Sequence, residues 1–280
     1  MKAQKVSATV WKYWKEHGRH ELPWRKTTDP YKILVSEVML QQTQVERVIP
    51  YYKNFLKQFP NVNALAQAPL SEVLKLWQGL GYNRRAKMLH EAAKYILSHQ
   101  PVYTASENTR LNLVFPGSAA ELEKLPGVGS YTAGAVAAFA YNHDEIFIET
   151  NIRTVVTHHV FPGEEQVSDA QVREVLERVH PKGNAREWYA ALMDYGAHLK
   201  RSGVRINARA KGYTKQSAFK GSGREVRGAI VRALTVAPTT RAKLLSLFGE
   251  ERRAQTEEQI EKLVNEHIIV LKGRKFELPN

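Results

Sequence analysis

The chain has 280 residues, 43% hydrophobic and 25% charged, which is the composition of a folded globular protein of one large or two ordinary domains. A formal net charge of +13 favours a polyanionic partner, nucleic acid first, although basic surfaces without such a partner are also common. The absence of cysteine excludes disulfides, thiol nucleophiles, and zinc or iron–sulfur sites with cysteine ligands.

Neither a signal peptide nor a membrane span is expected. The first 20 residues lack the apolar core of a signal peptide. The longest nearly apolar stretch, 132–141, is too short to cross a bilayer. We therefore expect a soluble, cytoplasmic protein, associated with the nucleoid if it is bacterial.

Helical periodicity dominates the first 200 residues. Asp29 followed by Pro30 predicts a helix start, because an acidic cap and then proline are typical of the first turn. The helix that follows is predicted over 31–44. Further helices are predicted at 7–17, 44–58, 62–66, 70–77, 84–99, 118–124, 130–141, 168–179 and 185–199. Strands are few, so the main body is predicted to be mainly α.

The composition changes after residue 200. Nine basic residues and one acid, Glu225, fall within 200–227, together with four glycines. The basic residues are Lys200, Arg201, Arg205, Arg209, Lys211, Lys215, Lys220, Arg224 and Arg227. This segment is interpreted as an irregular linker, either a solvated tail or a strap that follows DNA phosphates.

The last 57 residues show a winged-helix pattern. Helices are predicted near 225–236, 240–247 and 257–266, followed by a hairpin over 268–278 with Lys272 and Gly273 at its turn. The third helix of a winged helix often binds DNA. Here that helix is strongly acidic and would repel phosphates, which favours a packing role or a protein partner.

The strongest local motif is LEKLPGVGSYTAGA at 122–135. Its glycines allow a tight turn, and the helix that starts at Ser130 offers backbone N–H groups to an anion. This pattern predicts a helix-hairpin-helix that grips a DNA phosphate, with a plain corner between two helices as the alternative.

Two carboxylates stand in apolar surroundings. Glu149 precedes Thr150 and Asn151, where capping the next helix is the simpler interpretation. Glu37 lies within a very apolar helix, so it is either paired with an arginine or has a raised pKa that lets it act as an acid. Beside a DNA-gripping hairpin, the two point to acid-assisted bond cleavage through a cationic sugar.

Several motifs over residues 8–200 resemble the MutY-type A/G-specific adenine DNA glycosylases of the helix-hairpin-helix superfamily. They are LPWR (22–25), DPYKILVSEVMLQQTQV (29–45), GLGYNRRAKMLHEAA (79–93), LPGVGSYTAGA (125–135) and ALMDYGAHLK (191–200). The resemblance implies a glycosylase domain at 1–199, with a six-helix subdomain about 31–141 and a second subdomain from 1–30 and 142–199. The basic linker at 200–223 and a winged-helix-like domain at 224–280 would follow.

The resemblance also implies residue roles. Glu37 would protonate the adenine and later help to activate water, and Glu149 would stabilise the sugar cation, with Tyr131 and Asn151 in the same site. The residues implied to contact DNA are Gln41, Gln42, Tyr82, Gly127, Val128, Gly129 and Ser130. Of these, Gln42 and Tyr82 would enter the duplex while the adenine leaves it.

Three departures from the family are visible. Glu149 stands where the family usually has Asp, and Lys200 stands where the cysteines of its usual iron–sulfur cluster begin. The C-terminal segment is too short for the family's larger domain that senses 8-oxoguanine. Related bifunctional enzymes have a lysine nucleophile where this chain has Tyr131, so a monofunctional enzyme is expected.

We therefore predict a monomeric glycosylase that acts on double-stranded DNA and removes adenine mispaired with 8-oxoguanine or guanine. No cofactor and no metal are expected, because the His158–His159 and His17/His20 pairs have no supporting third ligand. One alternative is a glycosylase for another mispaired or damaged base on the same scaffold. The other is a non-catalytic protein that binds distorted DNA.

Overall fold

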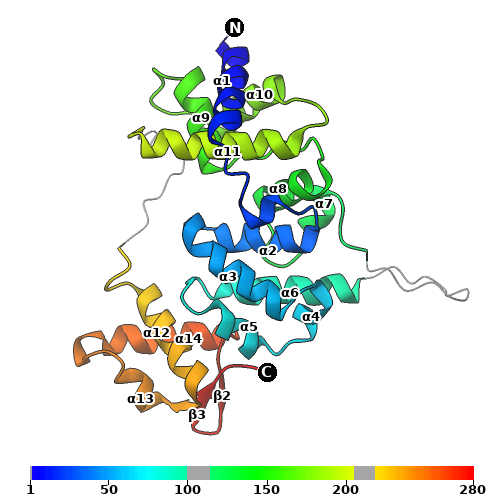
Figure 1. Cartoon of the computed structure of the whole chain (residues 1–280). Coiled ribbons are helices and arrows are strands. Elements are labelled where there is room, and N and C mark those ends of the chain that lie inside the picture. The colour runs from blue at the N-terminus through cyan, green and yellow to red at the C-terminus, as the bar shows by residue number, and fades with distance from the viewer. Residues whose placement is uncertain (1, 100–113, 205–217) are drawn as a thin grey trace, which may run out of the picture. The chain divides into compact units, whose positions relative to one another are not determined.

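The computed structural model describes residues 2–99, 114–204 and 218–280 (Figure 1). The chain divides into two compact units. The first unit comprises Met1–Glu37, Pro116–Lys124 and Val128–Lys215, and the second comprises Val38–Phe115, Leu125–Gly127 and Gln216–Asn280. Over the described residues the fold is mainly helical, as predicted. No helix in these ranges is long and apolar enough to span a membrane.

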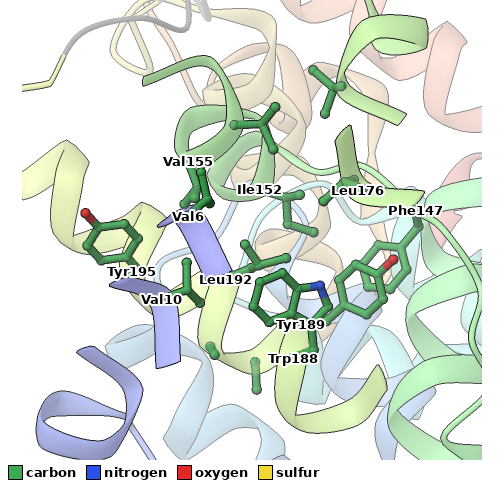
Figure 2. Close-up of a cluster of buried hydrophobic side chains, with 14 of the residues drawn as sticks. Val6, Val10, Phe147, Ile152, Val155, Leu176, Trp188, Tyr189, Leu192 and Tyr195 are labelled. Atoms are coloured by element: carbon green, nitrogen blue, oxygen red, sulfur yellow. The ribbon is translucent and has the colours of Figure 1, made fainter. Parts of the chain in front are cut away.

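The first unit is built around a long helix, α11. Its elements are α1 (Lys2–His17), η1 (Pro23–Arg25), the first two turns of α2 (Pro30–Leu40), α7 (Ala119–Leu122), α8 (Ser130–Tyr141), α9 (Thr150–Val160), α10 (Asp169–Val179) and α11 (Ala185–Arg201). Helices α1, α8 and α9 all pack on α11. The apolar side chains between them form one core, in which Val10, Ile152, Trp188 and Leu192 are fully buried (Figure 2).

One buried carboxylate joins the N-terminal segment to α11. Asp194 is only 2% exposed. Its oxygens accept hydrogen bonds from the Arg25 guanidinium at 2.6 and 2.9 Å and from Arg19 at 2.6 and 2.7 Å. Although burial opposes it, the two guanidinium groups and the backbone N–H of Arg19 hold the pKa of Asp194 below its usual value. Motifs LPWR and ALMDYGAHLK therefore meet at one ion-pair network.

The second unit packs two groups of elements together. Its first group is α3 (Val45–Gln58), α4 (Val62–Gln67), α5 (Leu70–Trp77) and α6 (Arg84–Ser98), around a core that includes Phe55, Leu65 and Trp77. The backbone N–H of Ser71 donates to the Pro279 carbonyl at 2.8 Å. The C-terminal segment thus packs on the α3–α6 group within one compact unit.

The C-terminal elements are α12 (Gly223–Val236), β1 (Thr239–Thr240), α13 (Arg241–Leu245), η3 (Glu250–Arg252), α14 (Arg253–Asn265), β2 (Val270–Lys272) and β3 (Lys275–Glu277). The three predicted helices and the hairpin are present. The sheet also has a third strand, β1, that was not predicted. Strand β1 pairs antiparallel with β3, and the strand order is β1-β3-β2.

The acidic third helix, α14, is held by basic partners within its own unit. Ion pairs join Glu257 to Arg241, Glu258 to Lys262 and Glu266 to Arg227. Its buried face packs on α12. The predicted helix at 257–266 carries four carboxylates, Glu257, Glu258, Glu261 and Glu266, and three of them are partly neutralised by these intramolecular pairs.

Several helix boundaries differ from the predictions: α1 begins at Lys2 rather than 7 and α14 at Arg253 rather than 257, and the ends of α2 and α11 differ as well. The start at Pro30 is confirmed, since the Asp29 carboxylate accepts hydrogen bonds from the N–H groups of Tyr31 and Lys32 at 3.0 and 3.3 Å. The helix ends at Leu40 rather than 44, because Gln42 has a left-handed backbone (φ +54°) that no α-helix can contain. Further along the chain, α11 continues to Arg201, so the predicted linker starts inside a helix.

Much of the predicted linker lies outside the described residues. Those positions are 205–217, which include Arg205, Arg209, Lys211 and Lys215. Only the flanking residues of the 200–223 segment are described.

Candidate active site

A buried glutamate and a tyrosine form the centre of the site. Glu37 is only 4% exposed, on α2. The Tyr131 hydroxyl, from the first turn of α8, donates a 2.9 Å hydrogen bond to Glu37 Oε2. This hydrogen bond joins two residues that lie 94 positions apart in the sequence. It places the Glu37 carboxyl group next to a neutral donor, the Tyr131 hydroxyl.

Packing around Phe147 explains why Tyr131 points this way. Helix α8 is apolar on nearly every side and is buried from Thr132 to Ala138. The Tyr131 ring meets Phe147 edge-on at 5.8 Å, and Phe147 stacks on Tyr189 at 3.9 Å (Figure 2 shows the latter pair). A side chain at Gly134 would come within 2.9 Å of Phe147, so this glycine is needed for the close approach.

Glu149 caps the helix that follows it, as the simpler interpretation of the sequence predicted. Its Oε1 accepts hydrogen bonds from the backbone N–H groups of Asn151 at 2.7 Å and Ile152 at 3.2 Å, at the start of α9. The side chain of Asn151 is a further hydrogen-bond partner. Capping holds the carboxyl group in one orientation, so the structural role also fixes where this group lies.

The electrostatics favour a protonated Glu37. Burial raises its pKa to about 7; the Tyr131 hydrogen bond opposes this rise and the charge of Glu149 adds to it. Arg25 is the arginine whose charge acts on Glu37, but its guanidinium pairs with Asp194. Among the described residues no ion pair to Glu37 forms, so none of the described arginines provides the internal salt bridge that was the alternative.

Glu149 has a different environment from Glu37. Burial raises its pKa as well, but backbone hydrogen bonds from Asn151 and Ile152 and the charge of Lys200 lower it. Two carboxyl groups that interact in one site do not ionise independently, and the better-solvated and better-bonded one ionises first. Burial thus favours the protonated form of Glu37, whereas the hydrogen bonds from Asn151 and Ile152 and the charge of Lys200 favour the ionised form of Glu149.

Lys200 is a site residue that the sequence did not identify as one. A side chain at Gly196 would come within 2.2 Å of the Asn151 carbonyl, so glycine allows the start of α9 to press against α11. Lys200 lies one turn further along α11, on the same face. Burial lowers its pKa and the nearby Glu149 opposes that shift. No pattern in the sequence distinguishes this lysine from the basic run that follows it.

The predicted helix-hairpin-helix is present. Its turn joins α7 to α8, with Gly127 in the left-handed region (φ +75°). A side chain there would come within 2.4 Å of Met88 Cβ, so only glycine fits. Gly129 caps α8 without any side-chain hydrogen bond, and Gly127, Gly129 and Ser130 are exposed. Free backbone N–H groups at an exposed helix N-terminus can bind an anion. The Val128 side chain is buried, so only its backbone would take part.

Gln41, Gln42 and Tyr82 belong to the second unit and are described within it. Gln42 is exposed, and Gln41 and Tyr82 are half-buried. The Tyr82 hydroxyl accepts a 2.8 Å hydrogen bond from Arg224, whose guanidinium also lies over the ring. The structure thus has the four predicted catalytic residues in one unit, and the predicted intercalating residues Gln42 and Tyr82, with the neighbouring candidate Gln41, in the other.

No metal site is visible in the parts of the chain that the structure describes. Within 2–99, 114–204 and 218–280, no group of three or more His or acidic side chains is placed to hold an ion. A hydrogen bond of 2.9 Å joins Nε2 of His159 to the Tyr195 hydroxyl, and one of 3.0 Å joins Nε2 of His180 to Oδ1 of Asp144.

Sequence comparisons give close relatives. Residues 35–187 match the family described as HhH-GPD superfamily base excision DNA repair protein. The adenine DNA glycosylase of Mycobacterium tuberculosis (strain CDC 1551 / Oshkosh) is 34% identical, over 98% of this chain and 94% of that protein. The adenine DNA glycosylase of Buchnera aphidicola subsp. Baizongia pistaciae is 36% identical over 68% of this chain, which spans about half (51%) of that relative.

The fold is shared with solved structures. A thermostable thymine-DNA glycosylase is similar with a TM-score of 0.59 and 24% identity, over 74% of this chain and 94% of that chain. An endonuclease III in a trapped covalent intermediate with DNA is similar with a TM-score of 0.55 and 19% identity, over 72% of this chain and 88% of that chain. The chain belongs to the HhH-GPD superfamily of base excision DNA repair proteins. Within that superfamily it is a DNA glycosylase.

Proposed function

We propose that this DNA glycosylase hydrolyses the N-glycosidic bond of adenine mispaired with 8-oxoguanine or guanine in double-stranded DNA. The observation that carries the proposal is the buried Glu37, whose pKa is raised to about 7 beside the Tyr131 hydroxyl and the Glu149 charge. Relatives named adenine DNA glycosylase, which align along nearly the whole chain, support adenine as the base.

The reaction starts with a proton on Glu37. A neutral adenine is a poor leaving group, so Glu37 donates its proton to a ring nitrogen of the extruded base. The bond between the sugar C1′ and the base then breaks, and its electron pair leaves with the adenine. The sugar that remains is an oxocarbenium-like cation.

The second half of the reaction uses both carboxylates. Glu149 stabilises the sugar cation by its fixed negative charge, which the N-cap bonds from Asn151 and Ile152 keep in place. A water adds to C1′, and its proton goes to the Glu37 carboxylate. Glu37 is thereby restored to its acid form, so no cofactor is consumed. Tyr131 keeps a hydrogen bond on Glu37 and offers no amine, so the enzyme is monofunctional.

DNA binding is proposed for two regions. The turn formed by Gly127, Val128, Gly129 and Ser130 binds a phosphate through backbone N–H groups. Gln42 and Tyr82, with Gln41 next to them, fill the space that the adenine leaves in the duplex. We further propose that the chain acts as a monomer and that its C-terminal winged-helix-like segment packs or binds protein rather than DNA.

The test is single-turnover incubation with duplexes that hold A:8-oxoG, A:G, T:G or A:T, followed by alkali to reveal abasic sites. The wild type should cleave at adenine opposite 8-oxoguanine and guanine. Glu37→Gln should bind these duplexes and cleave none, whereas Glu177→Gln, at an exposed position of α10, should behave as the wild type. Cleavage of T:G alone would replace adenine by thymine as the base. Equal cleavage by Glu37→Gln would remove Glu37 as the acid.

A further inference from the structure

Two loops of the second unit carry the predicted intercalating residues in an unusual backbone conformation. Gln42 (φ +54°) and Tyr82 (φ +51°) are both in the left-handed region. Residues other than glycine seldom adopt it, and they keep it only when their surroundings hold them there. We therefore expect interactions with other residues of this unit to stabilise both loops in this conformation.

Arg85 forms hydrogen bonds with both loops. Its Nη1 donates to the carbonyls of Val38 (2.9 Å), Met39 (2.9 Å) and Gln41 (2.5 Å). Its Nη2 donates to Thr43 Oγ1 (3.2 Å) and to the carbonyls of Leu80 (3.4 Å) and Gly81 (3.1 Å). One guanidinium thus bonds residues on both sides of Gln42 and the two residues before Tyr82.

The same guanidinium packs on aromatic rings. Its carbon lies 5.3 Å from the Tyr82 ring centroid and 5.5 Å from that of Trp77. Trp77 in turn donates from Nε1 to the Gly81 carbonyl at 3.1 Å. Burial lowers the pKa of Arg85 to about 10, so it remains charged at neutral pH. The loop before Tyr82 is therefore held by hydrogen bonds and by stacking.

Lysine cannot replace this arrangement. Arginine has five donors in a planar fork, which can reach two loops at once and stack on a ring. A lysine ammonium has the charge but only three donors around one atom, so it cannot make all the hydrogen bonds that the two Nη groups make, and it cannot stack on a ring as a planar group. Arg85→Lys thus keeps the charge and removes most of the bridge.

We propose that Arg85 is a positioning residue that holds the Gln42 and Tyr82 loops in the arrangement with which they enter the duplex as the base leaves. This inference rests on the proposed function, because it assigns Gln42 and Tyr82 to the extrusion of adenine. Arg85 has no part in the chemical step of this proposal. Its effect is limited to substrates whose adenine must first be unstacked and unpaired.

The test compares a paired with an unpaired adenine. Extrusion costs least when the base is already unpaired. Arg85→Lys should therefore cleave an A:G duplex about a hundredfold more slowly than the wild type, the loss expected when a group is misplaced by roughly 1 Å. It should cleave adenine in a single-base bulge at a rate near that of the wild type. Arg84→Lys, at the exposed neighbouring position, should match the wild type on both substrates.

A second readout does not depend on cleavage. The fluorescence of 2-aminopurine placed at the adenine position rises when the base leaves the stack. In a Glu37→Gln background this rise should be present, and Arg85→Lys should remove it. If the wild type released no adenine, the proposed function would fail while this measurement still tested Arg85.

Three outcomes would overturn the proposal. They are equal rates of wild type and Arg85→Lys on the A:G duplex, an equal loss on duplex and bulge, and an unchanged fluorescence rise. If Arg85→Lys does not fold, Thr43→Ala removes one acceptor of Nη2 and leaves the buried charge in place. Thr43→Ala should lower the duplex-to-bulge rate ratio, and an unchanged ratio would reject the inference.

Discussion

The Tyr131 hydroxyl donates a 2.9 Å hydrogen bond to Oε2 of Glu37, and this bond opposes the effect of burial on the Glu37 pKa. Burial has the larger effect, so the pKa of Glu37 is raised to about 7. The pair leaves the acid half-protonated near neutral pH, where a general acid works best.

The pH dependence of the single-turnover rate should report this acid. Since Glu37 must be protonated to act, the rate should fall about tenfold per pH unit above its pKa. Tyr131→Phe removes a bond that lowers the pKa of Glu37, so the alkaline limb should move to higher pH. The profile is measured from pH 5 to 9, and a limb that stays in place would contradict the coupling of Tyr131 to Glu37.

Stability should depend on pH through the same group. The native Glu37 binds its proton more tightly than the unfolded one, whose pKa is near 4.5. The wild type should therefore lose up to about 3 kcal/mol of unfolding free energy relative to Glu37→Gln as the pH rises from 4.5 to 7. Urea unfolding at pH 4.5 and 7.5 measures the difference. Parallel pH curves for the two proteins would show that Glu37 titrates normally.

Glu149 combines a capping role and a charge, and two variants separate them. Glu149→Gln keeps an oxygen that can accept from Asn151 and Ile152, so its stability should stay near that of the wild type while the rate falls roughly a hundredfold. Glu149→Ala should in addition lose about 1 kcal/mol of stability with the cap. Full activity of Glu149→Gln would show that the charge is not used.

Lys200 should set the acidic limb of the rate profile. Its charge lowers the pKa of Glu149, so Lys200→Met should raise that pKa and move the acidic limb to higher pH. Arg201→Met, at the exposed next position, is the matched control and should leave the limb where it is. A shift of equal size in both variants would assign the effect to overall charge.

Asp194 should be important for stability. Asp194→Asn leaves the two arginines at this site, Arg19 and Arg25, without their carboxylate. Breaking a buried ion pair costs about 3 kcal/mol, whereas removing the exposed Arg178–Glu174 pair by Arg178→Ala should cost less than about 1 kcal/mol. Urea unfolding compares the two, and a similar small loss in both would show that the Asp194 network adds little.

The helical parts of the fold followed from local patterns. Three of the signals depend only on residues close in sequence: Asp29–Pro30, the spacing of apolar residues in α5, and the PGVG turn before α8. The structure has helices at all three places. The end of α2 did not follow, because Gln42 has a left-handed backbone and the carbonyl next to it, that of Gln41, is bonded to Arg85, 43 residues after Gln42. Strand β1 was missed because two residues show no alternation, and only pairing with β3 defines it.

The sequence by itself determined the class of this protein: the motifs that identify the family, the two carboxylates, and the glycines of the hairpin are all read from neighbouring residues. The tertiary structure decided what those residues can do. Whether Glu37 pairs with an arginine or keeps a proton depends on where Arg25 and Tyr131 lie, and both come from distant segments. Ionisation and strain depend on neighbours in space, which no local pattern contains.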